Sequence, residues 1–241
     1  CMFIRGGTSR GPYFLKSDLP SDIDKRDKIL LAVMGSPDIR QIDGLGGAEP
    51  VKSKVAIIDR SKEEGIDVDY YFAQVKVDEP IVDTKPSCGN ILVGVGPYAI
   101  EKGLVEAKEG VTSVIVRDKN TGMKIEQLVQ TPGKKIQYEG SLKIDGVPTP
   151  GAPVELKFLN IIGSQTEKLF PSGNAKDVID GLNFTIVDCA VPMVIFDYKE
   201  LGLNGSETFN ELNKDKSLIN KMDKIRIKIA KEVGLGDVSK S

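Results

Sequence analysis

Cys88 is the side chain of this sequence best suited to proton transfer or nucleophilic attack. It precedes Gly89, Asn90 and the apolar run 91–96, and the chain contains no histidine. Chemistry near neutral pH must therefore use a thiol, an amine, a carboxylate or a tyrosine. If a helix begins after Cys88, its unpaired amides and its dipole favour the thiolate. The alternative is a small buried residue at a tight turn, because free cysteine is often buried.

Lys54 is a candidate partner for Cys88. It lies in Ser53–Ala56, which opens the strand that follows the glycine-rich turn 44–47. A partly buried amine there would favour the thiolate or bind a carboxylate, whereas most lysines are solvated surface cations. Sequence spacing alone does not show whether the two side chains meet.

A loop of small and hydrogen-bonding residues, 6–11, lies near the N-terminus, with Arg5 before it and Arg10 close to its end. Its backbone amides could hold a carboxylate. The alternative is an ordinary hairpin turn between strands predicted at 2–7 and 12–16.

Residues 89–102 allow two interpretations. The spacing Gly94-x-Gly96-x-x-Ala99, with Asp118 about 20 residues on, imitates a dinucleotide-binding fingerprint and would indicate an oxidoreductase. However, Pro97 has no N–H to offer a pyrophosphate. Apolar residues on every side instead favour a buried central helix, which we adopt.

The remaining pattern predicts an α+β protein, because strands and helices do not alternate regularly. We expect a first unit over 1–181 and the start of a second over 182–241. The other expected strands are 55–58, 68–77, 111–116, 124–130, 154–158, 184–187 and 193–196. Three other helices are expected. The first begins at Asp22 or Asp24 and ends at Gly35, and the other two cover 206–213 and 216–233.

Three finer expectations concern burial. Strand 68–77 should have one buried face, formed by alternate residues from Tyr71 to Val77. Cys189 should belong to the core. The last helix should have an inner face formed by Ile219, Met222, Ile225, Ile229 and Val233.

Composition restricts the function classes. Lys and Arg total 33 against 35 Asp and Glu, so no strong positive field recruits nucleic acid. No apolar run is long enough to cross a membrane. Three cysteines without a CxxC pair are typical of the cytoplasm, and the absence of histidine disfavours a metal site. The composition leaves a homo-oligomer open.

Several ordered motifs together resemble the methylaconitate isomerase family, which includes 3-methylitaconate Δ-isomerase and 4-oxalomesaconate tautomerase. The motifs are Arg5–Gly11, Met34–Asp38, Arg40–Gly47, Ser53–Ala56 and Cys88–Ile91. The resemblance implies a diaminopimelate-epimerase-like fold with two lobes, each a curled mixed sheet around a central helix. Members of this family are longer, so the second lobe is expected to be incomplete here.

The resemblance also implies a cofactor-independent allylic 1,3-proton shift in a small unsaturated di- or tricarboxylate. Lys54 and Cys88 match the family's proton-handling pair and should face each other across a gap that admits one small substrate. The residues matching carboxylate-binding segments are Thr8, Ser9, Gly46, Gly47, Ser53, Gly89 and Asn90. Arg10 departs from the lysine expected there and keeps the charge with a different geometry. The alternative function is a non-catalytic carboxylate-binding accessory protein or inactive fragment.

Overall fold

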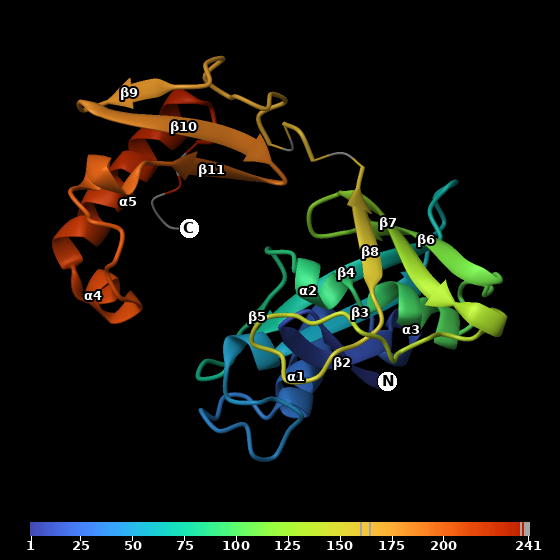
Figure 1. Ribbon diagram of the computed structural model, residues 1–241. Coiled ribbons are helices and arrows are strands. Elements are labelled where there is room, and N and C mark those ends of the chain that lie inside the picture. The colour runs from blue at the N-terminus through green and yellow to red at the C-terminus, as the bar shows by residue number, and fades with distance from the viewer. Residues whose placement is uncertain (160, 164, 237, 239–241) are drawn as a thin grey trace. The chain divides into compact units, whose positions relative to one another are not determined.

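A mixed eight-stranded sheet organises the N-terminal part of the chain (Figure 1). The computed structural model describes residues 1–159, 161–163, 165–236 and 238. It divides the chain into two compact units, Cys1–Leu159 and Asn160–Ser241. This division lies before the boundary near residue 182 expected from the sequence, and the assignment of the units to two lobes stays a prediction.

The first unit contains eight strands in the order β1-β2-β3-β4-β6-β7-β8, with β5 paired to β4. The β2–β3 and β4–β6 pairs are parallel and the others are antiparallel. The strands are β1 Met2–Gly6, β2 Ser9–Leu15, β3 Lys54–Arg60, β4 Val68–Val75, β5 Val82–Asp83, β6 Gly110–Asp118, β7 Lys124–Thr131 and β8 Val154–Phe158. All the strands predicted in this unit are present, although β2 begins at Ser9 and leaves only Gly7 and Thr8 in the turn.

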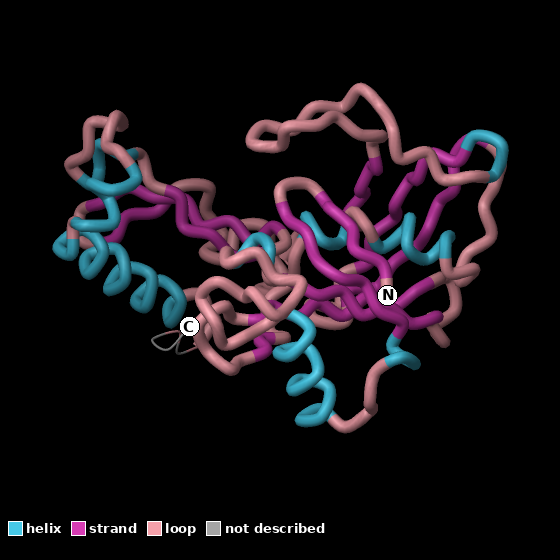
Figure 2. Tube along the Cα trace, turned by 90° about the horizontal axis from the view of Figure 1, so that it is seen from below, coloured by secondary structure: helices cyan, strands magenta, loops and turns pink. Residues whose placement is uncertain are grey.

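Both faces of the sheet are covered, which corrects the expectation of one buried face on β4. Val68, Tyr70 and Phe72 belong to a core shared with α2 (Gly89–Leu92) and α3 (Val95–Glu101). Ala73 and Val75 instead pack with α1 (Ile23–Met34) on the other face. Figure 2 shows helices on both faces of this sheet. Alternation from Tyr71 predicted one buried face. Tyr70 and Phe72, on the opposite face, are also apolar and are buried as well.

Helix α1 has the ends that its sequence predicts. The carboxylate of Asp22 accepts a hydrogen bond from the Lys25 amide at 2.9 Å, as an N-cap does. Gly35 ends the helix with φ of 76°, a left-handed conformation that glycine adopts without a Cβ penalty.

Residues 89–101 are helical, so the dinucleotide-fingerprint interpretation is wrong. The helix is interrupted between α2 and α3, where Gln127 of β7 contacts both pieces. The Gln127 Nε2 donates to the Leu92 carbonyl at 2.8 Å, and the Gln127 Oε1 accepts from the Gly96 amide at 2.6 Å. Gly94 packs directly on the Tyr13 ring. Gly94 and Gly96 therefore allow this helical segment to pack closely against the sheet.

The second unit is a three-stranded antiparallel sheet with two helices. Its elements are β9 Asp177–Ile179, β10 Leu182–Cys189, β11 Val191–Ile195, α4 Phe209–Lys214 and α5 Lys216–Glu232. The short β9 was not predicted. Ile225 and Ile229 pack on the sheet as expected, with Val233 partly buried beside them.

Two burial expectations in this unit are wrong. Ile219 and Met222 are 40% and 43% exposed, because the inward side of α5 is instead completed by Leu218 and Ala230. Cys189 is exposed, because it ends β10 where the chain turns into β11. Among the described residues, no helix has the length and apolar character needed to cross a membrane.

Candidate active site

Lys54 and Cys88 are in direct contact. Lys54 is the first residue of β3 and Cys88 is the N-cap of α2. The Lys54 Nζ donates a hydrogen bond to the Cys88 Sγ at 3.2 Å. Cys88 is only 8% exposed, and the Lys54 ammonium lies 5.5 Å from the centre of the Phe72 ring. The two groups thus lie side by side, which corrects the expectation that a substrate would separate them.

Two buried tyrosines hold the backbone around Cys88. The Tyr70 hydroxyl donates to the Cys88 carbonyl at 3.3 Å, and the Tyr13 hydroxyl donates to the Ile91 carbonyl. Burial raises the pKa of both phenols, and the charge of Cys88 raises each pKa further. Both tyrosines therefore stay protonated and act as fixed hydrogen-bond donors beneath α2.

Asn90 joins the start of α2 to the β1–β2 turn. Its Nδ2 donates to the Thr8 Oγ1 at 3.0 Å and the Ser9 Oγ at 3.4 Å. A Cβ on Gly6 would lie 1.9 Å from the Asn90 carbonyl oxygen, and one on Gly7 would lie 2.3 Å from its Oδ1. Only glycine permits this approach, so the structure brings Thr8, Ser9 and Asn90 together.

Two glycines relate this cluster to the Lys54–Cys88 pair. A Cβ on Gly11 would lie 1.8 Å from the Lys54 carbonyl oxygen, so β2 runs against the start of β3. A Cβ on Gly89 would meet nothing within 4 Å. Open space therefore adjoins Gly89, the residue after Cys88, where a ligand could reach the first amides of α2.

Gln41 organises the loop that contains Gly46 and Gly47. This buried side chain donates through Nε2 to the Ser53 Oγ at 2.7 Å and accepts at Oε1 from the Ala48 amide at 3.0 Å. Gly46 packs against the same carboxamide. Ser53 is fully buried, so its hydroxyl supports the loop from behind. Gly47 lies close to the Arg10 guanidinium, which places that cation at the loop.

Sequence reasoning missed the supporting roles of Gln41, Tyr70 and Asn120. Gln41 lies inside a quoted motif, but no spacing rule marks an amide as the centre of a loop. Asn120 lies between β6 and β7, and its neighbours in the sequence do not indicate that its side chain contacts β4 and the segment before Cys88.

Comparisons with known proteins agree with this architecture. The family model described as PrpF protein matches residues 1–241. The chain is 48% identical over 239 residues to a (4E)-oxalomesaconate Delta-isomerase of Novosphingobium sp., covering 99% of this chain and 67% of that protein. It is 45% identical to a 4-oxalomesaconate tautomerase of Pseudomonas putida, covering 99% and 66% respectively.

A solved structure extends the similarity to three dimensions. The crystal structure of a methylitaconate-delta-isomerase superposes with a TM-score of 0.84 at 40% identity, covering 97% of this chain and 62% of that one. This match confirms the expected diaminopimelate-epimerase-like fold. The chain spans about two thirds of the length of the relatives that it matches.

Proposed function

The chain belongs to the PrpF protein family, and from this membership we propose that it forms all or part of an isomerase acting on a small unsaturated di- or tricarboxylate. The proposed reaction is an allylic 1,3-proton shift that moves a carbon–carbon double bond or interconverts keto and enol forms. Relatives named for oxalomesaconate and methylitaconate support this class of substrate.

Lys54 and Cys88 would handle the proton. One of them accepts a proton from the carbon next to the double bond, and the electrons of that C–H bond move into the conjugated carboxylate to give an enolate-like intermediate. The proton then returns to the far carbon of the allylic system as the double bond shifts. Atoms and electrons balance without an added oxidant or reductant.

The observation that carries this proposal is the 3.2 Å contact between the Lys54 Nζ and the Cys88 Sγ. A proton can pass directly between groups at this distance. Because no carbon skeleton fits between them, both groups would approach the substrate from one side. The proton would then leave and return on the same face of the allylic system.

The substrate carboxylates would bind around this pair. The first amides of α2, those of Gly89 and Asn90, would be reached through the open space at Gly89. Thr8 in the β1–β2 turn and Ser9 at the start of β2, both bonded to Asn90, would supply further donors. Gly47 would contribute a backbone amide, with Ser53 holding its loop through Gln41. The Gly46 amide instead donates to the Met34 carbonyl at 3.2 Å, so Gly46 supports the loop and offers the substrate no free donor. Amides directed at a developing enolate stabilise its charge.

Cys88 must stay reduced to act in this way. All three cysteines are free thiols, which supports the cytoplasm as the location of the protein.

Proton NMR in heavy water tests the proposed function. The purified protein is incubated separately with methylitaconate, methylaconitate and oxalomesaconate, and each spectrum is followed for double-bond migration and for deuterium at the allylic carbons. Isomerisation of one of these acids would support the proposal. Binding by calorimetry without isomerisation or exchange would contradict it and favour a carboxylate-binding protein.

A further inference from the structure

Within the part of the chain that the structure describes, strand β4 has a stretch of edge that no neighbouring strand occupies. Parallel pairing with β6 covers Val68–Tyr70 and ends there, while antiparallel pairing with β5 covers Gln74 and Val75. Phe72 lies between the two pairings. Its backbone N–H and C=O on this edge therefore need other partners, because unpaired backbone groups are costly away from water.

The carboxamide of Asn120 fills this gap. Its Oδ1 accepts from the Phe72 amide at 2.8 Å, and its Nδ2 donates to the Phe72 carbonyl at 2.9 Å. This two-way exchange is the pattern that a paired strand residue would make. The same Nδ2 lies within 2.6 Å of the Thr84 carbonyl oxygen and 2.9 Å of the Pro86 carbonyl oxygen. One side chain thus connects β4 to the segment that enters Cys88.

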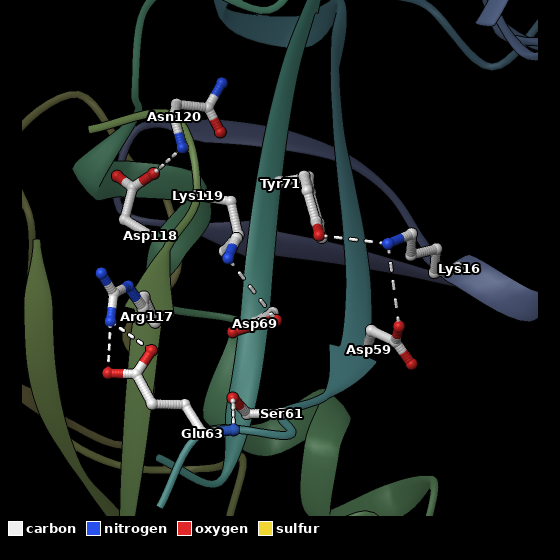
Figure 3. Close-up of polar contacts among 10 residues, drawn as sticks. All are labelled: Lys16, Asp59, Ser61, Glu63, Asp69, Tyr71, Arg117, Asp118, Lys119 and Asn120. Atoms are coloured by element: carbon white, nitrogen blue, oxygen red, sulfur yellow. Dashed lines mark hydrogen bonds and ion pairs between the residues drawn. The ribbon is translucent and has the colours of Figure 1, made fainter. Parts of the chain in front are cut away.

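Asp118 fixes the position of Asn120. This carboxylate is fully buried at the end of β6. Its Oδ1 accepts from the Asn120 amide at 2.8 Å, a contact drawn in Figure 3. Its Oδ2 accepts from the hydroxyl of Ser87, the residue before Cys88. The turn after β6 is therefore tied to the Cys88 segment by a second, independent bond.

We propose that Asn120, held by Asp118, is a positioning residue that sets the contact between Lys54 and Cys88. On one side it holds Phe72, which pairs with Ala56 of β3 and whose ring lies beneath the Lys54 ammonium. On the other side it holds Pro86, two residues before Cys88. Asn120 touches neither reacting group, so it acts through the backbones that carry them. The effect of this positioning on catalysis rests on the proposed function.

A double-mutant cycle on thiol reactivity tests this proposal without requiring turnover. The background is Cys1→Ser with Cys189→Ser, so that iodoacetamide reports Cys88 alone. The measured quantity is the factor by which Lys54→Met changes the rate of Cys88 alkylation at one fixed pH. That factor is determined with Asn120 intact and again with Asn120→Asp. The aspartate keeps the acceptor for Phe72 but places an oxygen against three carbonyl groups.

With Asn120 intact, we expect Lys54→Met to change the rate of Cys88 alkylation by a factor that differs from one. In the Asn120→Asp background this factor should be smaller by at least about threefold, as for residues coupled through contacts. Thr121→Ala is the matched control, because it alters the same turn without touching the carboxamide, and it should leave the factor unchanged. If Asn120→Asp does not fold, as judged by circular dichroism, Asn120→Ser, which removes the carboxamide without adding charge, replaces it in the same cycle.

An unchanged factor in the folded Asn120 variant would overturn the proposal, as would a factor of one in the starting protein. A merely structural Asn120 would lower the midpoint of urea unfolding and leave the factor as it was. If the factor shrinks while none of the three acids is isomerised, the positioning role stands and the proposed function fails.

Discussion

The Lys54 ammonium lies 3.2 Å from the Cys88 sulfur, although 34 positions separate the two residues in the sequence. Each begins an element, Lys54 at the start of β3 and Cys88 at the start of α2. They meet because α2 packs against the face of the sheet that contains Ala56 and Phe72. The pair is thus a product of tertiary packing, and its chemistry depends on how well that packing holds it.

Removing either member of the pair should disable the proposed reaction. We expect Lys54→Met and Cys88→Ala each to lower kcat by about 10²–10⁴-fold, the usual contribution of a general acid or base. The double variant should lose little beyond the more damaged single variant, since groups that act as a unit are not additive. Steady-state kinetics on the acid that the protein isomerises measures this. Lys16→Met and Cys189→Ala change exposed side chains of the same types and should retain turnover.

Asn90 offers a test of where the substrate carboxylate binds. Asn90→Asp keeps the shape of the side chain, removes the donors to Thr8 and Ser9, and adds negative charge beside the proposed anion site. We expect KM to rise about 10- to 100-fold, since hydrogen bonds to charged groups contribute about 1.5–3 kcal/mol. Asn90→Ala loses the donors without adding charge, so its KM should rise less. Equal KM values for the two variants would argue against an anion at this position.

Much of the fold could be predicted from local patterns. Asp22 and Gly35 mark the two ends of α1 because capping chemistry is local. The hairpin of β6 and β7 follows from apolar alternation on either side of a turn. The inner face of α5 was misjudged at Ile219 and Met222, because helical spacing shows which residues share a face but not what covers it.

The site was predicted only in part, for a similar reason. The motifs identified Lys54, Cys88 and Asn90, but their contacts depend on residues distant in sequence. Nothing near Asn120 in the sequence indicates that its carboxamide completes the edge of β4. Likewise, the direct contact of Lys54 with Cys88 follows from the packing of α2 against the sheet, which the spacing of residues along the sequence does not show.

Two glycines in the same helical segment should respond differently to substitution by alanine. A Cβ on Gly94 would lie 2.5 Å from the Tyr13 hydroxyl oxygen, and Tyr13 is fully buried. Such overpacking should lower the free energy of unfolding by about 1–3 kcal/mol. A Cβ on Gly89 meets nothing within 4 Å, so Gly89→Ala should change the free energy of unfolding by less than about 1 kcal/mol. Urea unfolding followed by circular dichroism compares them, and equal losses would contradict the packing at Gly94.

Tyr13 should give stability a distinct dependence on alkaline pH. Burial, and next the charge of Cys88, raise the pKa of its phenol well above the ordinary value of 10.0. The folded chain then keeps a proton that the unfolded chain releases, so this contribution is complete below pH 10 and declines as the pH rises further. The decline approaches about 1.4 kcal/mol per pH unit for one group. Tyr13→Phe lacks this titration. Its deficit in unfolding free energy, measured in urea at pH 9 and pH 11, should therefore be smaller at pH 11, and a constant deficit would show that the phenol titrates alike in both states.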